Sequence, residues 1–365
     1  MIILHTESSM NFGGQELRIC IEMEGLKKYG IDSILACKPN SKIASIAKSK
    51  GLKYYELPFS SSFCPISISK IFSIVKKHKV NIINSHNSKD AWNSVLVCKI
   101  LGIPFVRSRH IALKLRKHYI SKMIYTALAD RVLVTGEYIE KMLIENGVKP
   151  EKIYRIPTGI DIQKFSEQNK DSFKKELGIG NDTFLVGFVS VVRSDKGPHY
   201  FVRSIPYALK QIQNVRFVIV GDGNFLNKTK ALAEELGLKE YIIFTGHRDD
   251  IPSIMKSLDV FVLPAIKPEG VPQAVLQAFA SGTPVIASDI GGVNEVAIHG
   301  KTAILVKPKE PEKLAKAIIQ LIHDKNLQLK IVDGGKKLVT EYSLDNMLLK
   351  MKYFYENLIK KNEKT

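Results

Sequence analysis

The chain has 365 residues, of which 45% are hydrophobic and 25% charged. This suits about two globular domains and excludes disorder as a description of the whole chain. No apolar run approaches the roughly 18–20 residues of a membrane span. We also expect no signal peptide, because the first residues lack a basic region and a cleavage site. The four cysteines have no C-x-x-C spacing, which favours reduced thiols in a cytoplasmic protein over a disulfide framework.

Basic residues outnumber acidic ones by 54 to 36, a formal charge of +18, and the excess lies early in the chain. Residues 1–165 carry +13 and the remainder +5, and segment 107–122 holds six Lys or Arg and no acid. No nucleic-acid module is recognisable, so we expect no nucleic-acid partner. The segment is either a solvated surface or a face for an acceptor or an anionic membrane, where each charge contributes about 1 kcal/mol. The second hypothesis assigns that face to Arg107, Arg109, Lys114, Arg116 and Lys117.

In the first half of the chain, short apolar runs alternate with helical patterns, which is typical of parallel α/β architecture. Helices are expected over 14–29 and 66–79. The second of these gathers its apolar residues on one face, and we expect that face to pack on the sheet rather than to lie on a membrane. Buried strands are expected at 1–6, 33–37, 81–86, 104–109 and 131–136.

A polar stretch over 166–182 precedes a second series of alternating strands and helices. We therefore predict two doubly wound, Rossmann-like α/β domains, 1–165 and 166–342, that face each other across a cleft. A long last helix within 343–365 is expected to return to the first domain. Strands of the second domain are predicted at 183–192, 215–223, 241–247, 258–265 and 284–289.

Ligands of such folds bind at turns that follow the carboxyl ends of parallel strands, and three turns are candidates. The first, 13-GGQE-16, follows the opening strand, where Gly13 and Gly14 would let backbone N–H groups approach a phosphate. It lacks the G-x-G-x-x-G spacing of a dinucleotide fingerprint. The second, 191-VVRSDKG-197, carries Arg193 and Lys196, which could clamp a diphosphate or form ordinary surface ion pairs.

The third candidate is 268-PEGVPQAVLQAFASGTPVIAS-288. Pro272 suits the first turn of a helix, so the amides of Gly270, Val271 and Gln273 would present an anion site there. Glu269 precedes this helix, and Gln277 lies eight residues later. Both are candidates for contacts to a sugar or ribose, although a solvated Glu and Gln would have the same spacing.

Together these blocks resemble the family 4 glycosyltransferases of the GT-B fold, and the resemblance extends over nearly the whole chain. It is carried by GGQE, IPTGIDIQKF at the junction, VVRSDKG, GDG, TGHRDD, the PEGVPQ block and GGVNEV. The resemblance implies a retaining transferase that takes a sugar from a nucleotide-sugar without a metal or other cofactor. It places the donor mainly on the C-terminal domain and the acceptor on the N-terminal domain.

The resemblance also implies roles for individual residues. Arg193 and Lys196 would stabilise the departing diphosphate, and Gly13 and Gly14 would approach the donor phosphate. His110 matches a histidine that lies against the donor sugar in relatives, although a structural role at a strand end would leave the same pattern. Glu269 matches the first Glu of the family's E-x7-E pattern and would contact the transferred sugar.

Further expectations concern weaker matches. His86 is a structural or acceptor-side candidate, and Arg248 lies in the 246–251 loop, which we expect to read the base. The second Glu of the E-x7-E pattern is Gln277 here, which keeps an acceptor oxygen but loses the charge. Ribose binding is therefore expected to survive, although an inactive or repurposed member would show the same change.

The expected reaction transfers a sugar, from UDP in preference to GDP, to a hydroxyl of a glycan or lipid-linked acceptor. Surface-polysaccharide or lipopolysaccharide assembly at the inner face of the cytoplasmic membrane would use such a product. The retaining chemistry that the resemblance implies leads us to expect attack on the face that the leaving phosphate vacates, and no carboxylate is an obvious covalent nucleophile. The alternatives are a nucleotide-sugar 2-epimerase and a non-enzymatic protein that binds an anionic polymer or membrane. A phosphorylase would need a longer chain and a Lys-bound cofactor.

Overall fold

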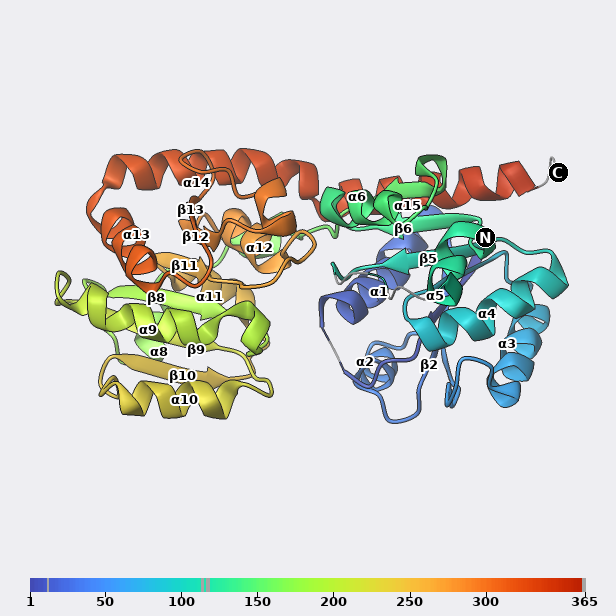
Figure 1. Cartoon of the computed structure of the whole chain (residues 1–365), viewed down its shortest axis with the longest axis horizontal. Coiled ribbons are helices and arrows are strands. Elements are labelled where there is room, and N and C mark those ends of the chain that lie inside the picture. Colours follow the sequence, from blue (N-terminus) through green and yellow to red (C-terminus); the bar gives the residue numbers. More distant parts are fainter. Residues whose placement is uncertain (12, 113–114, 116–118, 363–365) are drawn as a thin grey trace. The chain divides into compact units, whose positions relative to one another are not determined.

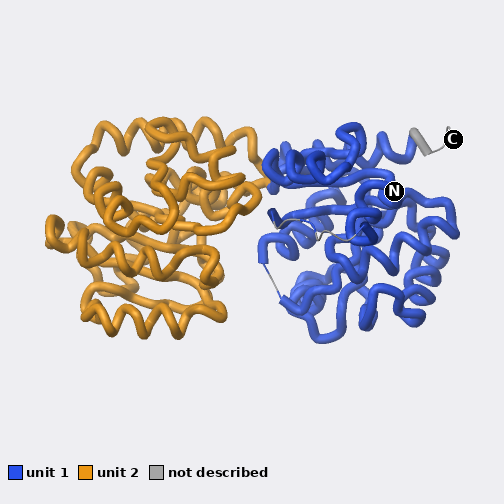
Figure 2. The backbone as a smooth tube through the Cα atoms, in the orientation of Figure 1, with its two compact units in different colours: residues 1–158, 345–365 blue, residues 159–344 orange. Residues whose placement is uncertain are grey.

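The computed structural model describes the chain except residues 12, 113–114, 116–118 and 363–365. It divides into two compact units, Met1–Thr158 with Asp345–Thr365, and Gly159–Leu344 (Figure 2). Each unit is a parallel sheet between helices, so the predicted α/β class with two Rossmann-like domains is confirmed. No helix in the described part of the chain has the length and apolar character needed to cross a membrane.

The first unit contains a seven-stranded parallel sheet in the order β3-β2-β1-β4-β5-β6-β7 (Figure 1). The strands are β1 Ile2–Glu7, β2 Asp32–Cys37, β3 Tyr54–Glu56, β4 Ile82–Ser85, β5 Phe105–Arg109, β6 Arg131–Val134 and β7 Ile153–Arg155. Its α-helices are α1 Gly14–Gly25, α2 Lys42–Ser49, α3 Pro65–His78, α4 Ser88–Leu101, α5 Tyr119–Met123, α6 Glu137–Glu145 and α15 Leu344–Asn362.

Helix α3 shows why the apolar periodicity predicts packing on the sheet. Pro65 occupies its first turn, where the missing N–H costs nothing, and Lys79 ends it in a left-handed conformation. Ile71 and Val75 are buried in the core of the first unit, and Phe72 packs against that core. This face of α3 is therefore covered by its own sheet, as expected.

The second unit contains a six-stranded parallel sheet in the order β10-β9-β8-β11-β12-β13. Its strands are β8 Phe184–Val189, β9 Val215–Val220, β10 Ile242–Gly246, β11 Val260–Leu263, β12 Val285–Ser288 and β13 Ile304–Val306. Its α-helices are α7 Ile162–Ser166, α8 Ser172–Glu176, α9 Pro198–Leu209, α10 Leu226–Glu235, α11 Ile251–Ser257, α12 Gln273–Ser281, α13 Pro311–His323 and α14 Lys325–Val339.

Helices cover both faces of this sheet, so its strands are apolar on both sides. In β8, Leu185 and Val189 belong to one core, whereas Val186 and Phe188 belong to the other. The alternation follows from the two-residue period of side chains along a strand. The boundary between the units falls after Thr158 rather than at 165, because Ile160 and Phe165 are already buried in the second unit.

The last helix, α15, belongs to the first unit and is tied to it by buried contacts. The Tyr355 hydroxyl accepts a hydrogen bond from Asn84 Nδ2 of β4 at 2.9 Å. Leu348 lies so close to Gly25 that a Cβ on that glycine would be 2.4 Å from Leu348 Cδ1. Met351 is fully buried and its sulfur lies 3.6 Å from Arg18 Nη2. The first unit is thus built from both ends of the chain.

Candidate active site

In the first unit, the turn after β1 is held by carboxylates. Gly13 is the N-cap of α1, and its backbone N–H donates to Glu16 Oε2 at 2.8 Å. This predicted phosphate-binding amide is therefore satisfied by a carboxylate, an anion of the same hydrogen-bonding kind as a phosphate oxygen. A Cβ at Gly13 would meet only Glu16 Oε2, at 3.7 Å, so local packing does not require glycine there. Gly14 is the first residue of α1.

Glu7, at the end of β1, is a site residue that sequence reasoning missed. Its Oε1 accepts from the Ser9 N–H at 2.7 Å and from Asn87 Nδ2, and its Oε2 accepts from Gln15. Burial, together with the neighbouring carboxylates of Asp90 and Glu16, raises the pKa of Glu7 to about 8. An acid directly after a buried strand that leads to a glycine turn was the available signal.

Three histidines from adjacent strands form a chain of hydrogen bonds in the first unit. His5 Nδ1 lies 3.1 Å from His86 Nε2, and His86 Nδ1 lies 3.1 Å from His110 Nε2. Both pairs of rings are stacked, with centroids 5.4 Å apart. Burial holds the pKa of His86 and of His110 well below the ordinary value, so both rings are neutral at pH 7. The structure brings the two predicted histidines together and adds His5.

Arg107 and Arg109, which the second hypothesis assigned to a face for an acceptor or an anionic membrane, do not lie on an exposed face. Both are buried, with 5% and 7% of their surface exposed, because β5 lies inside the sheet. Arg107 Nη1 donates to Ser85 O at 2.9 Å, Arg109 Nη1 donates to Tyr125 Oη at 3.0 Å, and both guanidinium groups lie over the Tyr125 ring. His86 is also buried. The other residues assigned to this face, Lys114, Arg116 and Lys117, lie outside the described residues.

In the second unit, the turn after β8 brings Arg193 and Lys196 together. Arg193 is the N-cap of a 3₁₀ turn, Ser194–Lys196, of which Lys196 is the last residue and Gly197, with a φ of 74°, the C-cap. A Cβ on Gly197 would lie 1.8 Å from Pro264 O, so only glycine fits against the loop after β11. The Arg193 side chain is 53% exposed and pairs with Asp195 at 2.9 Å. This cation can therefore turn to a ligand without leaving a buried group unpaired.

Lys196 forms an ion pair with Glu269 through Nζ and Oε2. The structure thus brings together two residues that are 73 positions apart and that the sequence assigned to diphosphate and sugar binding. Glu269 Oε1 is buried and has no hydrogen-bond partner among the described residues. A buried carboxylate oxygen without a donor is costly, and a ligand hydroxyl would satisfy it.

Helix α12 follows Glu269 and supports the same turn. Pro272 is its N-cap, and the predicted residues Gly270 and Val271 precede it. The Gly292 N–H donates to Glu269 O at 2.9 Å, and a Cβ at Gly292 would be 2.7 Å from that oxygen. The glycine pair 291–292 therefore lets a 3₁₀ turn pack directly under the loop. Gln273 and Gln277, four residues apart and both half-buried, share one face of α12.

Arg248, predicted to bind the donor, is engaged by two carboxylates. It pairs with Glu176 of α8 at 2.5 Å and with Asp250 at 2.7 Å, and the hydrogen bonds to these groups raise its pKa further. These contacts fasten the loop after β10 to α8. A ligand contact from this loop would therefore come from its backbone rather than from the Arg248 guanidinium.

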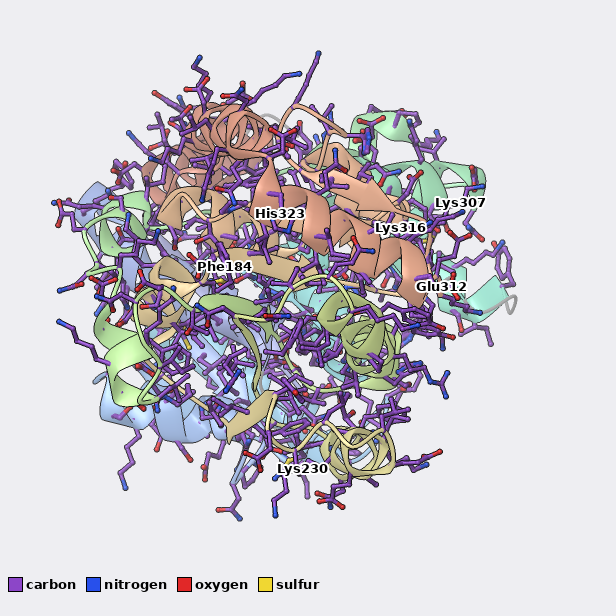
Figure 3. All side chains as sticks on the ribbon, turned by 90° about the vertical axis from the view of Figure 1, so that its left-hand side faces the viewer. Phe184, Lys230, Lys307, Glu312, Lys316 and His323 are labelled. Carbon is purple, nitrogen blue, oxygen red and sulfur yellow. The ribbon has the colours of Figure 1, made fainter. Side chains whose placement is uncertain are left out.

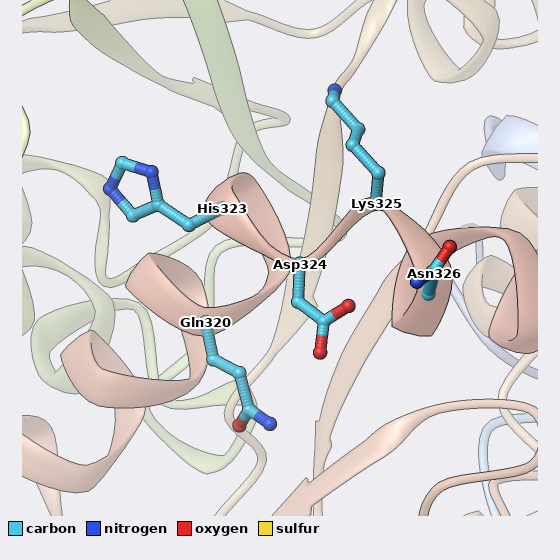
Figure 4. Close-up of a pocket in the computed structure, with 5 residues that line it drawn as sticks. All are labelled: Gln320, His323, Asp324, Lys325 and Asn326. Carbon is cyan, nitrogen blue, oxygen red and sulfur yellow. The ribbon is translucent and has the colours of Figure 1, made fainter.

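Other features of the second unit lie apart from these residues. Helix α13 carries Glu312, Lys316 and His323 on an exposed face (Figure 3). A hollow at the turn between α13 and α14 (Figure 4) includes Asp324, whose carboxylate caps α14 by accepting from the Leu327 N–H at 2.9 Å. Among the described residues, no group of three or more His, Cys, Asp or Glu side chains could hold a metal ion.

Solved structures with the same architecture identify the fold. The chain superimposes on a glycosyltransferase from Rickettsia africae with a TM-score of 0.88 and 22% identity, covering 98% of each chain. It superimposes on Alr3699/HepE of Anabaena, solved in complex with UDP, with a TM-score of 0.87 and 21% identity, covering 98% of this chain and 100% of that one. At these identities the likeness concerns the fold, which is the GT-B arrangement of two Rossmann-like domains.

Sequence comparison then identifies the family. Residues 12–164 match the model of glycosyltransferase family 4, and residues 169–338 match that of the group 1 glycosyl transferases. The UDP-Gal:alpha-D-GlcNAc-diphosphoundecaprenol alpha-1,3-galactosyltransferase of Escherichia coli is 28% identical over 356 residues, 93% of this chain and 88% of its own. The chain belongs to the family 4 glycosyltransferases, and it is a glycosyltransferase.

Proposed function

We propose that the protein transfers a sugar from a UDP-sugar, with retention of anomeric configuration, to a hydroxyl of a lipid-linked glycan in surface-polysaccharide or lipopolysaccharide assembly. The observation that carries this proposal is the Lys196–Glu269 ion pair with a buried, unpartnered Glu269 Oε1. One side chain of the pair suits a diphosphate and the other a sugar hydroxyl, which are the two parts of a nucleotide-sugar that meet at the reacting carbon.

The two cations stabilise the leaving group. As the bond from the anomeric carbon to the UDP oxygen breaks, negative charge grows on the diphosphate, and Arg193 and Lys196 neutralise it. Lys196 is held by Glu269 until the donor arrives, so no unpaired charge is buried in the free protein. Gln277 remains able to accept a hydrogen bond from a ribose hydroxyl.

The acceptor hydroxyl attacks the anomeric carbon on the face from which UDP leaves, and its proton passes to the departing phosphate oxygen. One C–O bond forms and one breaks, and no protein base or metal is required. Glu269 orients the sugar through Oε1, and His110 hydrogen-bonds another of its hydroxyls. These assignments rest on the family's motif positions and on the chemistry of the side chains in each unit.

Relatives support the choice of donor and acceptor. The Escherichia coli relative is named for UDP-galactose and a diphosphoundecaprenol-linked acceptor. The Anabaena structure contains UDP, and the same protein has been solved with UDP-glucose. A lipid-linked acceptor would bring the protein to the inner face of the cytoplasmic membrane, where Lys114, Arg116 and Lys117 would meet anionic headgroups.

The proposal is tested by incubating the protein with UDP-galactose, UDP-glucose or GDP-mannose and a polyprenyl-diphosphate-linked sugar. We expect acceptor-dependent release of UDP and a product with the donor's anomeric configuration by NMR. An inverted product or a trapped glycosyl–enzyme adduct would contradict the mechanism. Conversion of the nucleotide-sugar to an epimer without any acceptor would instead indicate the 2-epimerase.

A further inference from the structure

The hydrogen-bonded series of rings His5–His86–His110 follows from the register of the strands in the sheet. His5 pairs in register with Asn84 of β4, and His86 lies two residues further on, so both side chains occupy the same face. Asn84 pairs with Val106 of β5, and His110 follows at an even spacing of four residues. Each ring is thus displaced toward the carboxyl edge relative to the previous one. The chain runs diagonally from the interior of the sheet to its ligand-binding edge.

The two ends of the chain differ in their surroundings. His5 is 0% exposed, and its Nε2 has no hydrogen-bond partner among the described residues. His110 directly follows β5 and is partly exposed. Burial lowers the pKa of His5, and the charges that face it come from α1, where Glu22 and Arg18 act in opposite directions. Glu22 pairs with Arg18 through Oε1 at 2.6 Å, whereas its Oε2 is buried without a hydrogen-bond partner among the described residues. No hydrogen bond or ion pair joins a carboxylate to His5 in the part of the protein that the structure describes.

A neutral imidazole carries one N–H, so three rings in series can be ordered in only two ways. If every N–H is on Nδ1, His5 donates to His86, His86 donates to His110, and the unpartnered His5 Nε2 is a lone pair. If every N–H is on Nε2, the direction reverses and an N–H is left buried without an acceptor. Orphaned buried donors are rarer and more costly than under-satisfied acceptors. Because the His5 end of the series is buried, the arrangement with every N–H on Nδ1 is favoured.

We propose that His5 and His86 are positioning residues that fix His110 as the Nδ1–H tautomer, so that its remaining nitrogen is a hydrogen-bond donor. This rests on the proposed function, in which His110 contacts the donor sugar. The opposite order would present a lone pair at the same position. A chain of two buried rings thus decides whether His110 gives or accepts a hydrogen bond, without touching the substrate itself.

The tautomers can be measured directly in the intact protein. With ¹⁵N-labelled histidine rings, long-range ¹H–¹⁵N NMR at neutral pH distinguishes a protonated Nδ1 from a protonated Nε2. His5→Phe, His86→Phe and His110→Phe each remove one set of signals and so assign the chain, with exposed His323 as internal reference. We expect Nδ1–H on all three rings. Nε2–H on His86 or His110, or a charged imidazolium in the chain, would overturn the proposal.

Activity provides the second readout. His86→Phe removes both hydrogen bonds of the middle ring, and we expect kcat/KM for a UDP-sugar to fall about tenfold. Affinity for UDP, which lacks the sugar, should stay within about twofold. Tyr355→Phe is the matched control, since it removes one buried hydrogen bond on the same face of the sheet. If His86→Phe behaved like this control, the positioning role would be contradicted.

The NMR measurement and the activity measurement distinguish a failure of the histidine proposal from a failure of the proposed function. If no UDP-sugar is turned over by the unaltered protein, the proposed function fails, whereas the NMR result on the histidine chain stands by itself. If His86→Phe does not fold, the tautomers of the unaltered protein still decide the matter, and His5→Phe interrupts the chain one ring further from the edge.

Discussion

Among single residues, Lys196 is the one on which the proposed stabilisation of the leaving diphosphate depends most. Replacement by Met keeps the length and apolar stem of the side chain but removes the charge that would face the leaving diphosphate. We expect kcat to fall about 10²- to 10³-fold, as when one stabilising donor is removed from other enzymes. Steady-state UDP release measures this. Lys313→Met is the control, because Lys313 pairs with Glu310 on α13 at the surface, and its activity should not change.

A second residue-scale prediction concerns Glu7. Its pKa is raised from 4.5 to about 8 in the folded protein, so the folded state holds a proton that the unfolded state releases. Unfolding free energy should therefore be highest below about pH 4.5, as far as this group is concerned, and should decrease as the pH rises toward 8. Glu7→Gln, which resembles the protonated form, should flatten this decrease in urea titrations at pH 5, 7 and 9.

The matched control for this prediction is Glu24→Gln, since the Glu24 side chain is 40% exposed in its ion pair with Lys50. Its stability should follow the pH profile of the unaltered protein. A Glu7→Gln profile parallel to that of the unaltered protein would show that Glu7 is already ionised in the folded state at neutral pH.

Residues whose role follows from local spacing could be predicted from the sequence, and those that depend on strand order could not. Lys196 and Glu269 were assigned from motif positions, and the structure pairs them. The His5 link was missed because it requires β1 to lie beside β4. Arg107 and Arg109 were misplaced because a run of basic residues suggests solvent, whereas β5 is covered on both faces.

At the scale of elements, the turn that carries Arg193 and Lys196 depends on Gly197. Alanine in the left-handed region costs about 1–2 kcal/mol. At Gly197 a clash with Pro264 O should cost about 1–3 kcal/mol more. Gly178→Ala is the control, because Gly178 has a φ of 66° but open space around its Cα. In urea denaturation, the free energy of unfolding of Gly197→Ala should be clearly lower than that of Gly178→Ala. Equal losses of unfolding free energy in the two variants would mean that the turn shifts to accommodate the added methyl group at little cost.

Long apolar strands were predictable and short edge strands were not. The strands β1, β2, β4, β5 and β6 and the strands β8 to β12 coincide with the predicted runs. The missed strands β3, β7 and β13 have three residues each, too few for a recognisable period. Each of the three is also an edge strand of its sheet, so it pairs on one side only and needs a less apolar sequence. The remaining edge strand, β10, is longer and was predicted.

At the scale of the whole molecule, the chain's end completes its first unit, so the two units should respond differently to a change in α15. Tyr355 is 0% exposed, and Tyr355→Ala should cost about 3–5 kcal/mol, as for other buried aromatic residues. Calorimetry should show the transition of the first unit shifted to lower temperature and that of the second unit, residues 159–344, unchanged. An equal decrease in the unfolding temperatures of both units would contradict the assignment of α15 to the first unit.

The basic character of the first 165 residues also belongs to this scale. Substituting Ser for all three of Lys114, Arg116 and Lys117 removes three positive charges. Binding to vesicles that contain anionic lipid should then weaken at low ionic strength. Co-sedimentation with vesicles of anionic and of neutral lipid measures the effect. Unchanged binding to anionic vesicles would show that this segment does not meet the membrane.

Acceptor-dependent UDP release by the unaltered protein and by Lys196→Met, measured under the same conditions, tests the proposed sugar transfer most directly. We expect UDP-galactose or UDP-glucose to be consumed only when a polyprenyl-diphosphate-linked sugar is present, and we expect the variant to lose most of this activity while still folding. UDP release that needs no acceptor, or that is unaffected by the loss of Lys196, would contradict the proposed transfer.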